Sequence, residues 1–355
     1  MGQVKLSPQP VAIDLFCGAG GLTHGLRRAG IRVALGVDVD PAAKYPYETN
    51  NPRSKFLLRD IWKLSPSEVV SHYPRGAVRI LAGCAPCQPF SSYTQGTAVE
   101  QRADWRLLDR FAMFAEALEP QIVTMENVTN LRRHEVYQRF TDRLTELGYT
   151  VSDHDVECWR YGVPQMRTRL VLLASRHGAV DLVRPTHGGR RLRTVRHAIG
   201  NLSKLRAGAS SLADPLHRSA ALSKRNLRRI RASKPGGTWR DWDPRLRSPC
   251  HLSDRGFGFS PVYGRMSWEE PAPTITTRCF NYGSGRFGHP SAARAISLRE
   301  AALLQSFPPG YEFVPANGDV HFMTIGRLVG NAVPVRLGEI IGRSIVRHLG
   351  VANGF

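Results

Sequence analysis

The sequence lacks several features that mark common classes of protein. No run approaches the roughly 18 apolar residues of a membrane-spanning helix, and MGQVKLSPQPVAIDLF at the start contains no charged-then-apolar signal peptide. We therefore expect a protein of the cytosol, where disulfides between the six cysteines are disfavoured. A closed zinc site usually needs two close ligand pairs, and only one CxxC is present, at Cys84 and Cys87. We expect no metal site.

Acidic residues are also scarce. The 355-residue chain has 49 Lys and Arg against 29 Asp and Glu, a net charge of +20. Much of the excess lies between Arg176 and Arg247, where 18 basic residues accompany four acidic ones. Such a charge attracts polyanions because binding releases their counterions. No amphipathic apolar face accompanies it, so we expect a nucleic-acid partner and no membrane.

The first half of the chain alternates apolar runs with helical patterns. Strands are expected at 11–16, 33–37, 78–83, 121–127 and 168–174, and helices at 22–29, 107–118 and 136–147. This order predicts an α/β fold with a mostly parallel sheet covered on both faces. Ligands of such sheets bind at the carboxyl ends of the strands.

The composition changes after about residue 184, where Gly, Pro, Ser and Arg become frequent. Helical periodicity returns from Ser297, and 326–349 is expected to form one final helix. We predict a catalytic, cofactor-binding domain at 1–184, a smaller irregular domain at 185–293, and a return to the first domain at 294–355.

The stretch DLFCGAGGLTHGL (14–26) is expected to form a strand, a glycine turn and a helix. Its glycines let the backbone approach a ligand, but Thr23 stands where the dinucleotide fingerprint GxGxxG requires glycine. Asp38, 20 residues after Gly18, is placed to accept hydrogen bonds from ribose hydroxyls. Asp60 is suited to an adenine amino group. These residues favour a nucleoside cofactor without pyrophosphate, and S-adenosylmethionine is the obvious one.

Six motifs resemble, in order and spacing, those of the cytosine-C5 DNA methyltransferases: DLFCGAGGL, GCAPCQPFS, MENV, QMRTR, REAALLQSFP and GNAVP. The segment before REAALLQSFP corresponds to that family's variable target-recognition region. The resemblance implies a Rossmann-like, S-adenosylmethionine-dependent fold and a DNA (cytosine-5-)-methyltransferase that flips its target base out of a specific duplex sequence. It also implies a monomer in the bacterial cytosol, the modification half of a restriction-modification system, with a cognate endonuclease acting separately.

The resemblance assigns the catalytic roles residue by residue. Cys87 is the thiolate that adds to C6 of the cytosine, and nearby cations would favour its ionisation. Glu126 is the acid at N3, and Arg169 bonds O2. Arg167, two residues earlier, is expected on the same strand face, supporting a phosphate or the loop. Cys84 is expected to be inert.

The resemblance also assigns binding residues. For the cofactor they are Phe16, Gly18, Gly20, Gly21, Leu22, Asp38, Val39, Asp60, Ile61, Leu107, Asn331 and Ala332. A core role is the alternative for Phe16. For DNA they are Gln88 and Ser91, in a loop that closes over the extruded base, and Arg240, Arg278 and Thr274 in the recognition region.

Three rival functions stay open on the sequence alone. One branch of the same family modifies tRNA, although the long basic segment favours DNA. A non-catalytic DNA-binding protein is disfavoured because Cys87, Glu126 and Arg169 are all present. A redox protein built on CAPC is disfavoured because Gln88-Pro89 replaces the helix that usually follows such a dithiol.

Overall fold

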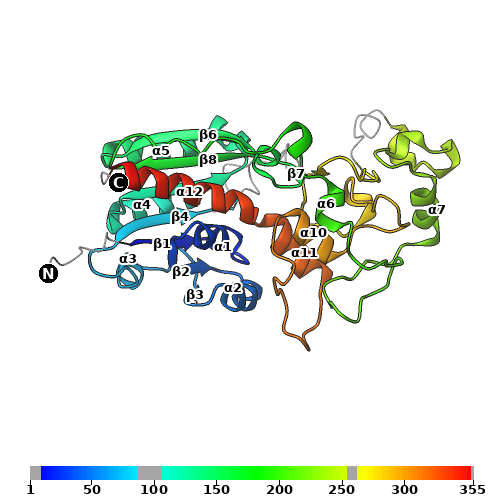
Figure 1. The fold of residues 1–355 in the computed structure, drawn as a ribbon, viewed down its shortest axis with the longest axis horizontal. Helices are drawn as coiled ribbons and strands as arrows, with labels where there is room; N and C mark the ends of the chain where they lie inside the picture. The colour runs from blue at the N-terminus through cyan, green and yellow to red at the C-terminus, as the bar shows by residue number, and fades with distance from the viewer. Residues whose placement is uncertain (1–8, 87–105, 254–261, 353–355) are drawn as a thin grey trace. The chain divides into compact units, whose positions relative to one another are not determined.

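The structure is a computed structural model that describes residues 9–86, 106–253 and 262–352. The chain divides into two compact units (Figure 1). The first comprises residues 1–157, 168–185 and 333–355, and the second comprises residues 158–167 and 186–332.

A seven-stranded sheet forms the centre of the first unit. Its spatial order is β3 (Lys55–Leu58), β2 (Arg32–Asp38), β1 (Pro10–Leu15), β4 (Val78–Gly83), β5 (Ile122–Asn127), β8 (Thr168–Ser175) and β6 (Thr150–Glu157). The strands from β3 to β5 are parallel, whereas β8 runs antiparallel to β5 and β6. The expected mostly parallel sheet is confirmed. The strand order reverses between β1 and β4, the place where such sheets bind ligands.

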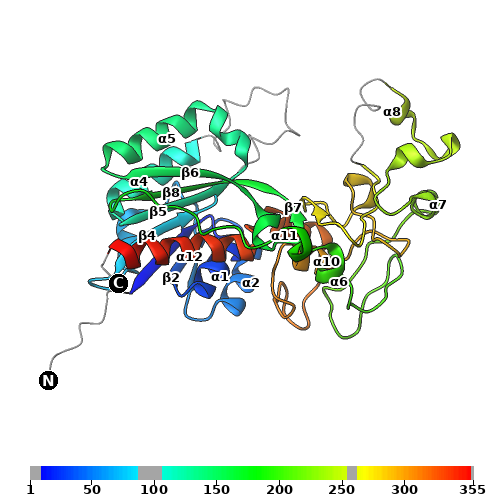
Figure 2. The same cartoon turned by 45° about the horizontal axis from the view of Figure 1, so that its top comes forward.

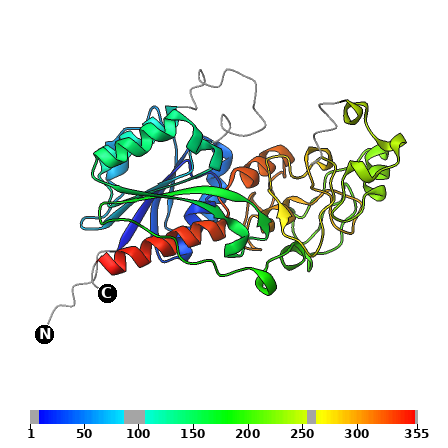
Figure 3. The same cartoon turned by 90° about the horizontal axis from the view of Figure 1, so that it is seen from above.

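Helices cover both faces of this sheet. α4 (Leu107–Leu118) and α5 (Glu135–Glu146) lie on one face, and α1 (Gly21–Arg28) and α12 (Val335–Ala352) lie on the other (Figures 2 and 3). Two short helices follow β2 and β3 in the chain, α2 (Lys44–Asn50) and α3 (Pro66–Val70).

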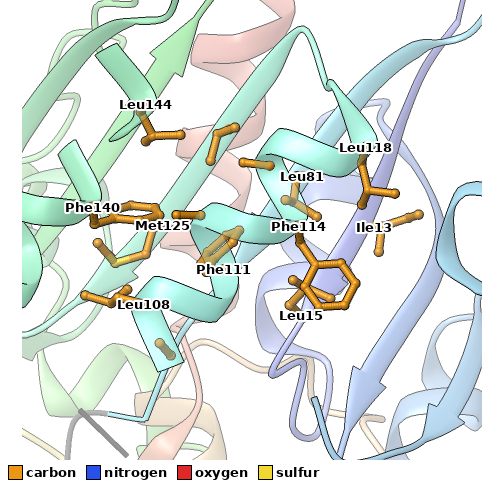
Figure 4. Close-up of a cluster of buried hydrophobic side chains, with 14 of the residues drawn as sticks. Ile13, Leu15, Leu81, Leu108, Phe111, Phe114, Leu118, Met125, Phe140 and Leu144 are labelled. Atoms are coloured by element: carbon orange, nitrogen blue, oxygen red, sulfur yellow. The ribbon is translucent and has the colours of Figure 1, made fainter. Parts of the chain in front are cut away.

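The core of the first unit lies between the sheet and α4. Ile13 and Leu15 of β1 and Met125 of β5 pack with Phe111 and Phe114 of α4, and all five side chains are buried (Figure 4). Because both faces of the sheet are covered, its central strands are apolar on both sides. That is why they appear in the sequence as unbroken apolar runs.

α1 and α12 approach so closely that only glycine fits at their crossing. A side-chain carbon at Gly25 would lie 2.4 Å from the carbonyl oxygen of Val335 and 2.5 Å from the amide nitrogen of Glu339. One at Gly342 would lie 2.6 Å from Cβ of Ala29. The last helix of the chain therefore packs directly on the first.

The prediction of a single final helix at 326–349 is wrong. The segment contains the end of α11 (Phe322–Asn331) and most of α12. Ala332 between them is extended, with φ −63° and ψ 142°. Pro334 has no amide hydrogen to continue a helix and disfavours helical backbone in the residue before it. The break falls where the chain passes from the second unit to the first.

The second unit is irregular, as expected. Its two-stranded sheet pairs β7 (Gln165–Met166) with β9 (Ala272–Pro273), and its described α-helices besides α11 are α6 (Val195–Ile199), α7 (Lys224–Ala232), α8 (Pro249–Leu252) and α10 (Leu298–Leu304). α10 begins after Ser297, whose hydroxyl accepts a hydrogen bond from the amide of Glu300 in a capping box.

The two units do not follow the limits predicted for the domains. The second unit begins near the predicted boundary at 185 but continues to 332 rather than 293, because α10 packs on α6 and α11. It also includes 158–167, which the β7–β9 pairing joins to it. The assignment of catalysis and recognition to separate domains stays a prediction.

Candidate active site

The glycine turn after β1 is fastened to the end of β2. The amide of Gly18 donates a hydrogen bond to Oδ2 of Asp38 at 2.7 Å, and the amide of Asp40 donates to Oδ1 at 2.9 Å. Gly20 precedes α1 with φ +88°, a conformation that favours glycine. Burial raises the pKa of Asp38 above its usual value. Two elements expected to bind one cofactor are therefore adjacent.

Thr23 has a structural task at the position where the dinucleotide fingerprint has glycine. Its hydroxyl donates to Oδ2 of Asp14 at 2.7 Å, and both side chains are buried. Among the described residues, Oδ1 of Asp14 has no hydrogen-bond partner. Burial raises the pKa of Asp14 to about 7. A glycine at 23 would leave this carboxyl without its side-chain donor.

Val39, expected at the ribose, follows β2, whereas Asp60 and Ile61, expected at the adenine, follow β3, its neighbour in the sheet. Val39 is 68% exposed, Asp60 is partly exposed and Ile61 is buried. The carbonyl oxygen of Ile61 accepts a hydrogen bond from Nε of Arg110 in α4 at 2.9 Å, which holds this turn against the helix. Carboxylates after neighbouring strands, beside an exposed apolar side chain, fit the hydroxyl and amino groups of a nucleoside. The residues present therefore fit S-adenosylmethionine.

Three other expected cofactor residues have contacts within the first unit. Phe16 has φ +60°, and its ring meets Phe111 edge-on with centroids 6.5 Å apart. Leu22 in α1 and Leu107 at the start of α4 are buried. These contacts give all three a packing role, and their contact with a cofactor stays a prediction. Gly21 is the first residue of α1.

Two expected catalytic side chains meet at the carboxyl end of β5. Because β8 runs antiparallel to β5, its first residues lie beside the last residues of β5. Nε of Arg169 is 3.2 Å from Oε1 of Glu126, and only 13% and 3% of these side chains are exposed. Nη1 of Arg169 also donates to the carbonyl oxygen of Thr168 at 2.7 Å. An enclosed carboxylate is costly without such a partner.

The end of β5 also anchors the segment that precedes residue 87. Nδ2 of Asn127 donates to the carbonyl oxygen of Ala85 at 3.0 Å. The thiol of Cys84 donates to Oε2 of Glu126 at 2.9 Å. Cys84, which was expected to be inert, therefore contacts an expected catalytic side chain. Three expected site residues lie outside the described residues: Cys87, Gln88 and Ser91.

Sequence reasoning missed both anchoring residues. Asn127 stands next to Glu126 in MENV, so the motif itself was a signal for it. Cys84 belongs to the GCAPCQPFS motif, but its contact partner is 42 residues away in the chain. No local pattern reports a contact of that kind.

The prediction that Arg167 and Arg169 share a strand face is wrong. β7 ends at Met166 and β8 begins at residue 168 in a different sheet, so Arg167 lies between two strands. Its side chain is buried, and Nη1 donates to the carbonyl oxygen of Ile275 at 3.3 Å. The hydroxyl of Thr274 donates to the carbonyl oxygen of Met166 at 2.8 Å. Both side chains brace the β7–β9 pair, and their roles toward DNA stay predictions.

Asn331 is the last residue of α11 and Ala332 follows it, both in the second unit. A side-chain carbon at the preceding Gly330 would lie 2.3 Å from the amide nitrogen of Thr277, so the end of this helix packs directly against the backbone of Thr276 and Thr277. Nε2 of Gln305 donates to the carbonyl oxygen of Ala332 at 3.3 Å. These contacts explain the glycine of GNAVP, and the expected cofactor contacts of Asn331 and Ala332 stay predictions.

Comparison with known proteins decides the family. The model of the C-5 cytosine-specific DNA methylases matches residues 11–347. The chain belongs to this family. The Type II methylase M.HgiDII of Herpetosiphon aurantiacus is 48% identical to this methylase over 340 residues, which is 95% of each chain. The Type II methyltransferase M.Eco47II of Escherichia coli is 30% identical over 351 residues, 96% of this chain and 80% of the relative.

Solved structures agree on the fold. A prophage-encoded protein of E. coli has a TM-score of 0.74 at 20% sequence identity, and the match covers 96% of the methylase and 100% of that chain. The expected Rossmann-like methyltransferase fold and the expected enzyme class, a DNA cytosine-5 methyltransferase, are therefore confirmed.

In the second unit of the methylase, aromatic residues from the basic segment and from the chain after it gather into a small core. Trp239, Trp242 and Tyr282 are buried in it. The guanidinium of Arg229 packs into it, 5.4 Å from the ring centroid of Trp242. The other cations of α7 are exposed, and the helix contains no acidic residue. We call this set the basic face of α7: Lys224, Arg225, Arg228 and Arg231.

Two arginines expected to contact DNA are also exposed. Arg240 lies in a short 3-10 helix, with its guanidinium carbon 5.7 Å from the ring centroid of Trp239. Arg278 follows the segment that contains Thr274. Both side chains are accessible to a phosphate or a base edge.

Within residues 9–86, 106–253 and 262–352, no three or more His, Cys, Asp or Glu side chains are grouped so that they could hold a metal ion. The helices of these residues also include none with the length and apolar character of a membrane span.

Proposed function

We propose that the methylase transfers a methyl group from S-adenosylmethionine to carbon 5 of a cytosine flipped out of a specific duplex DNA sequence. The observation that carries the proposal is the enclosed pair of Glu126 and Arg169. A carboxyl group and a guanidinium side by side match N3 and O2 on the edge of one cytosine. Because a stacked base is not accessible to buried side chains, the target must leave the duplex.

The reaction needs a nucleophile because carbon 5 of cytosine is itself a weak one. The Cys87 thiolate forms a bond to C6, while Glu126 gives a proton to N3 and Arg169 donates a hydrogen bond to O2. These contacts stabilise the charge that the addition puts on the ring. Carbon 5 becomes enamine-like and takes the methyl group, whose bond to the sulfonium sulfur would break to leave S-adenosylhomocysteine. Water then removes the C5 proton, the bond between C6 and Cys87 breaks, and the N3 proton returns to Glu126.

The first unit would hold the cofactor, which supplies its methyl group as a sulfonium electrophile. We assign the ribose hydroxyls to Asp38, whose carboxylate also fixes the glycine turn through Gly18. Val39 would lie at the ribose with Asp38, and Asp60 and Ile61 would take the adenine. The turn itself offers backbone amides close to the ligand, because glycine has no side chain to exclude it.

The second unit would bind double-stranded DNA. The basic face of α7 would contact phosphates, which position a protein on the duplex without reading its sequence. Arg240 and Arg278 are the candidate base or phosphate contacts. Because its relatives are Type II methylases, we propose that the protein is the modification half of a restriction-modification system. It would act as a monomer on DNA in the bacterial cytosol, and a cognate endonuclease would act separately.

Incubation with plasmid DNA and labelled S-adenosylmethionine tests the proposal. We expect incorporation into DNA and its loss in Cys87→Ala, and bisulfite sequencing of the product should report one recognition sequence. Transfer RNA in a parallel reaction is expected to stay unlabelled. Absence of label from DNA with the wild-type protein, or equal labelling by Cys87→Ala, would contradict the proposal. Label in tRNA alone would assign the enzyme to the RNA-modifying branch.

A further inference from the structure

The carboxylate of Glu126 is divided between two partners. Oε2 accepts a hydrogen bond from the thiol of Cys84 at 2.9 Å, and Oε1 lies 3.2 Å from Nε of Arg169. Glu126 itself is 2% exposed, so water does not compete freely for either oxygen. The proposed reaction uses Glu126 and Arg169 but gives Cys84 no task.

The backbone holds this thiol in a fixed place. The amide of Cys84 donates to the carbonyl oxygen of Leu15 at 3.3 Å, which ties the residue to the end of β1. The next residue, Ala85, is buried, and its carbonyl oxygen accepts from Nδ2 of Asn127 at 3.0 Å. The segment of Cys84 and Ala85, which follows β4, is therefore attached to the strands on both sides of β4, and this places the thiol beside the carboxylate.

Without that donor, Glu126 and Arg169 have a competing arrangement. A guanidinium forms parallel hydrogen bonds to both oxygens of a carboxylate when nothing prevents it. Here Arg169 contacts one oxygen through Nε, and its Nη1 donates to the carbonyl oxygen of Thr168. A two-oxygen pair would turn both side chains toward each other. Neither would then be directed at the edge of a cytosine.

We propose that Cys84 is a positioning residue that keeps one oxygen of Glu126 away from Arg169. Both catalytic side chains then stay directed toward N3 and O2 of the target base. The inference rests on the proposed function, and Cys84 acts through Glu126 rather than on the substrate. Its effect therefore falls on the chemical step and not on cofactor binding.

Steady-state kinetics of Cys84→Ala and Cys84→Ser test this role. For Cys84→Ala we expect kcat to fall about tenfold or more, the effect of losing one hydrogen bond to a charged group. The KM for S-adenosylmethionine should stay within about twofold, since the thiol donates to Glu126 and not to the glycine turn. The rate of covalent trapping on 5-fluorocytosine DNA should fall in parallel. Cys84→Ser should recover most of kcat, because its hydroxyl replaces the donor.

A double-mutant cycle separates this role from general packing. If Cys84 acts through Glu126, Cys84→Ala should cause little further loss of kcat in a Glu126→Ala background. Cys279→Ala is the matched control, a buried thiol in the second unit, and should leave kcat within about twofold of wild type. Circular dichroism establishes that each variant is folded.

The possible outcomes distinguish a failure of this inference from a failure of the proposed function. Wild-type kcat in Cys84→Ala, a serine variant as slow as the alanine variant, or losses that add in the cycle would overturn the inference while leaving the proposed function intact. Absence of methylation by the wild-type enzyme would instead contradict the proposed function. Should Cys84→Ala fail to fold, Cys84→Ser carries the test, because a folded serine variant with low kcat also overturns it.

Discussion

Replacing Gly25 by alanine tests how the end of the chain holds the cofactor-binding half of the first unit. The added carbon would lie 2.4 Å from the carbonyl oxygen of Val335, where ordinary contact begins at 3.4 Å. The amide nitrogen of Glu339 and the carbonyl carbon of Gly338 would lie 2.5 and 2.6 Å away. All three are backbone atoms, which cannot rotate aside, so α12 must move by about 1 Å.

Two opposing effects determine the expected loss of stability in Gly25→Ala. Alanine in place of glycine stabilises a helix by about 1 kcal/mol. Overpacking a rigid contact costs about 1–3 kcal/mol and occasionally more, and three backbone contacts place Gly25→Ala at the upper end. We expect the free energy of unfolding to fall by about 2 kcal/mol. Because α1 begins at the glycine turn, the Kd for S-adenosylmethionine should also rise.

Urea denaturation followed by circular dichroism measures the first effect, and calorimetric titration measures the second. Gly350→Ala is the matched control, since it lies in α12 and nothing approaches its position within 4 Å among the described residues. It should be neutral or slightly stabilising. Equal stability of Gly25→Ala and Gly350→Ala would refute the inferred packing of α1 on α12.

Three other predictions concern charged groups. Burial raises the pKa of Asp14 from 3.8 to about 7, so between these pH values the folded state keeps a proton that the unfolded state has lost. The free energy of unfolding should therefore fall by about 1.4 kcal/mol for each pH unit of increase. Denaturation from pH 4 to 8 should show a smaller slope in Asp14→Asn, and an unchanged slope would contradict the prediction. Asp38→Ala should raise the Kd for S-adenosylmethionine, measured by titration calorimetry, at least about tenfold, because it removes a hydrogen-bond acceptor and releases the amide of Gly18. An unchanged Kd would show that Asp38 does not bind the cofactor. Replacing the basic face of α7 by glutamines should weaken DNA binding and lower the steepness of log affinity against log salt concentration by about 0.9 per lost phosphate contact. An unchanged slope in a filter-binding titration would show that the duplex does not contact this face.

The sequence predicts most strands of the sheet and names the catalytic residues, but it does not predict which of them lie side by side. The strands ending at Leu15, Asp38, Gly83 and Asn127 are buried on both faces, so apolar runs mark them directly. β6 escaped notice because TVSDHDVE is an edge strand with polar side chains. Its antiparallel neighbour β8 was expected as a strand, but only the sheet shows that its direction brings Arg169 to Glu126.

The remaining errors concern contacts between distant segments. The helical pattern at 326–349 is real, but Pro334 interrupts it, and the pattern alone did not show which side of the break belongs to which unit. Arg167 and Arg169 are two residues apart, a spacing that suggests one face of a strand, yet the chain changes sheets between them. The thiol contact of Cys84 depends on where β4 and β5 end in space, which no local pattern reports.

The packing of α12 on α1 also sets the moment at which the first unit can finish folding. α1 ends at Arg28 and α12 begins at Val335, so the ribosome makes about 300 residues between the two halves of this contact. At about 5–20 residues per second, α1 waits on the order of 15–60 s for its partner. A chain released before α12 would contain Glu126, Arg169 and the glycine turn, yet the face of its sheet that α1 and α12 share would be covered by α1 alone. Synthesis of α12 is therefore required before the first unit can complete this packing.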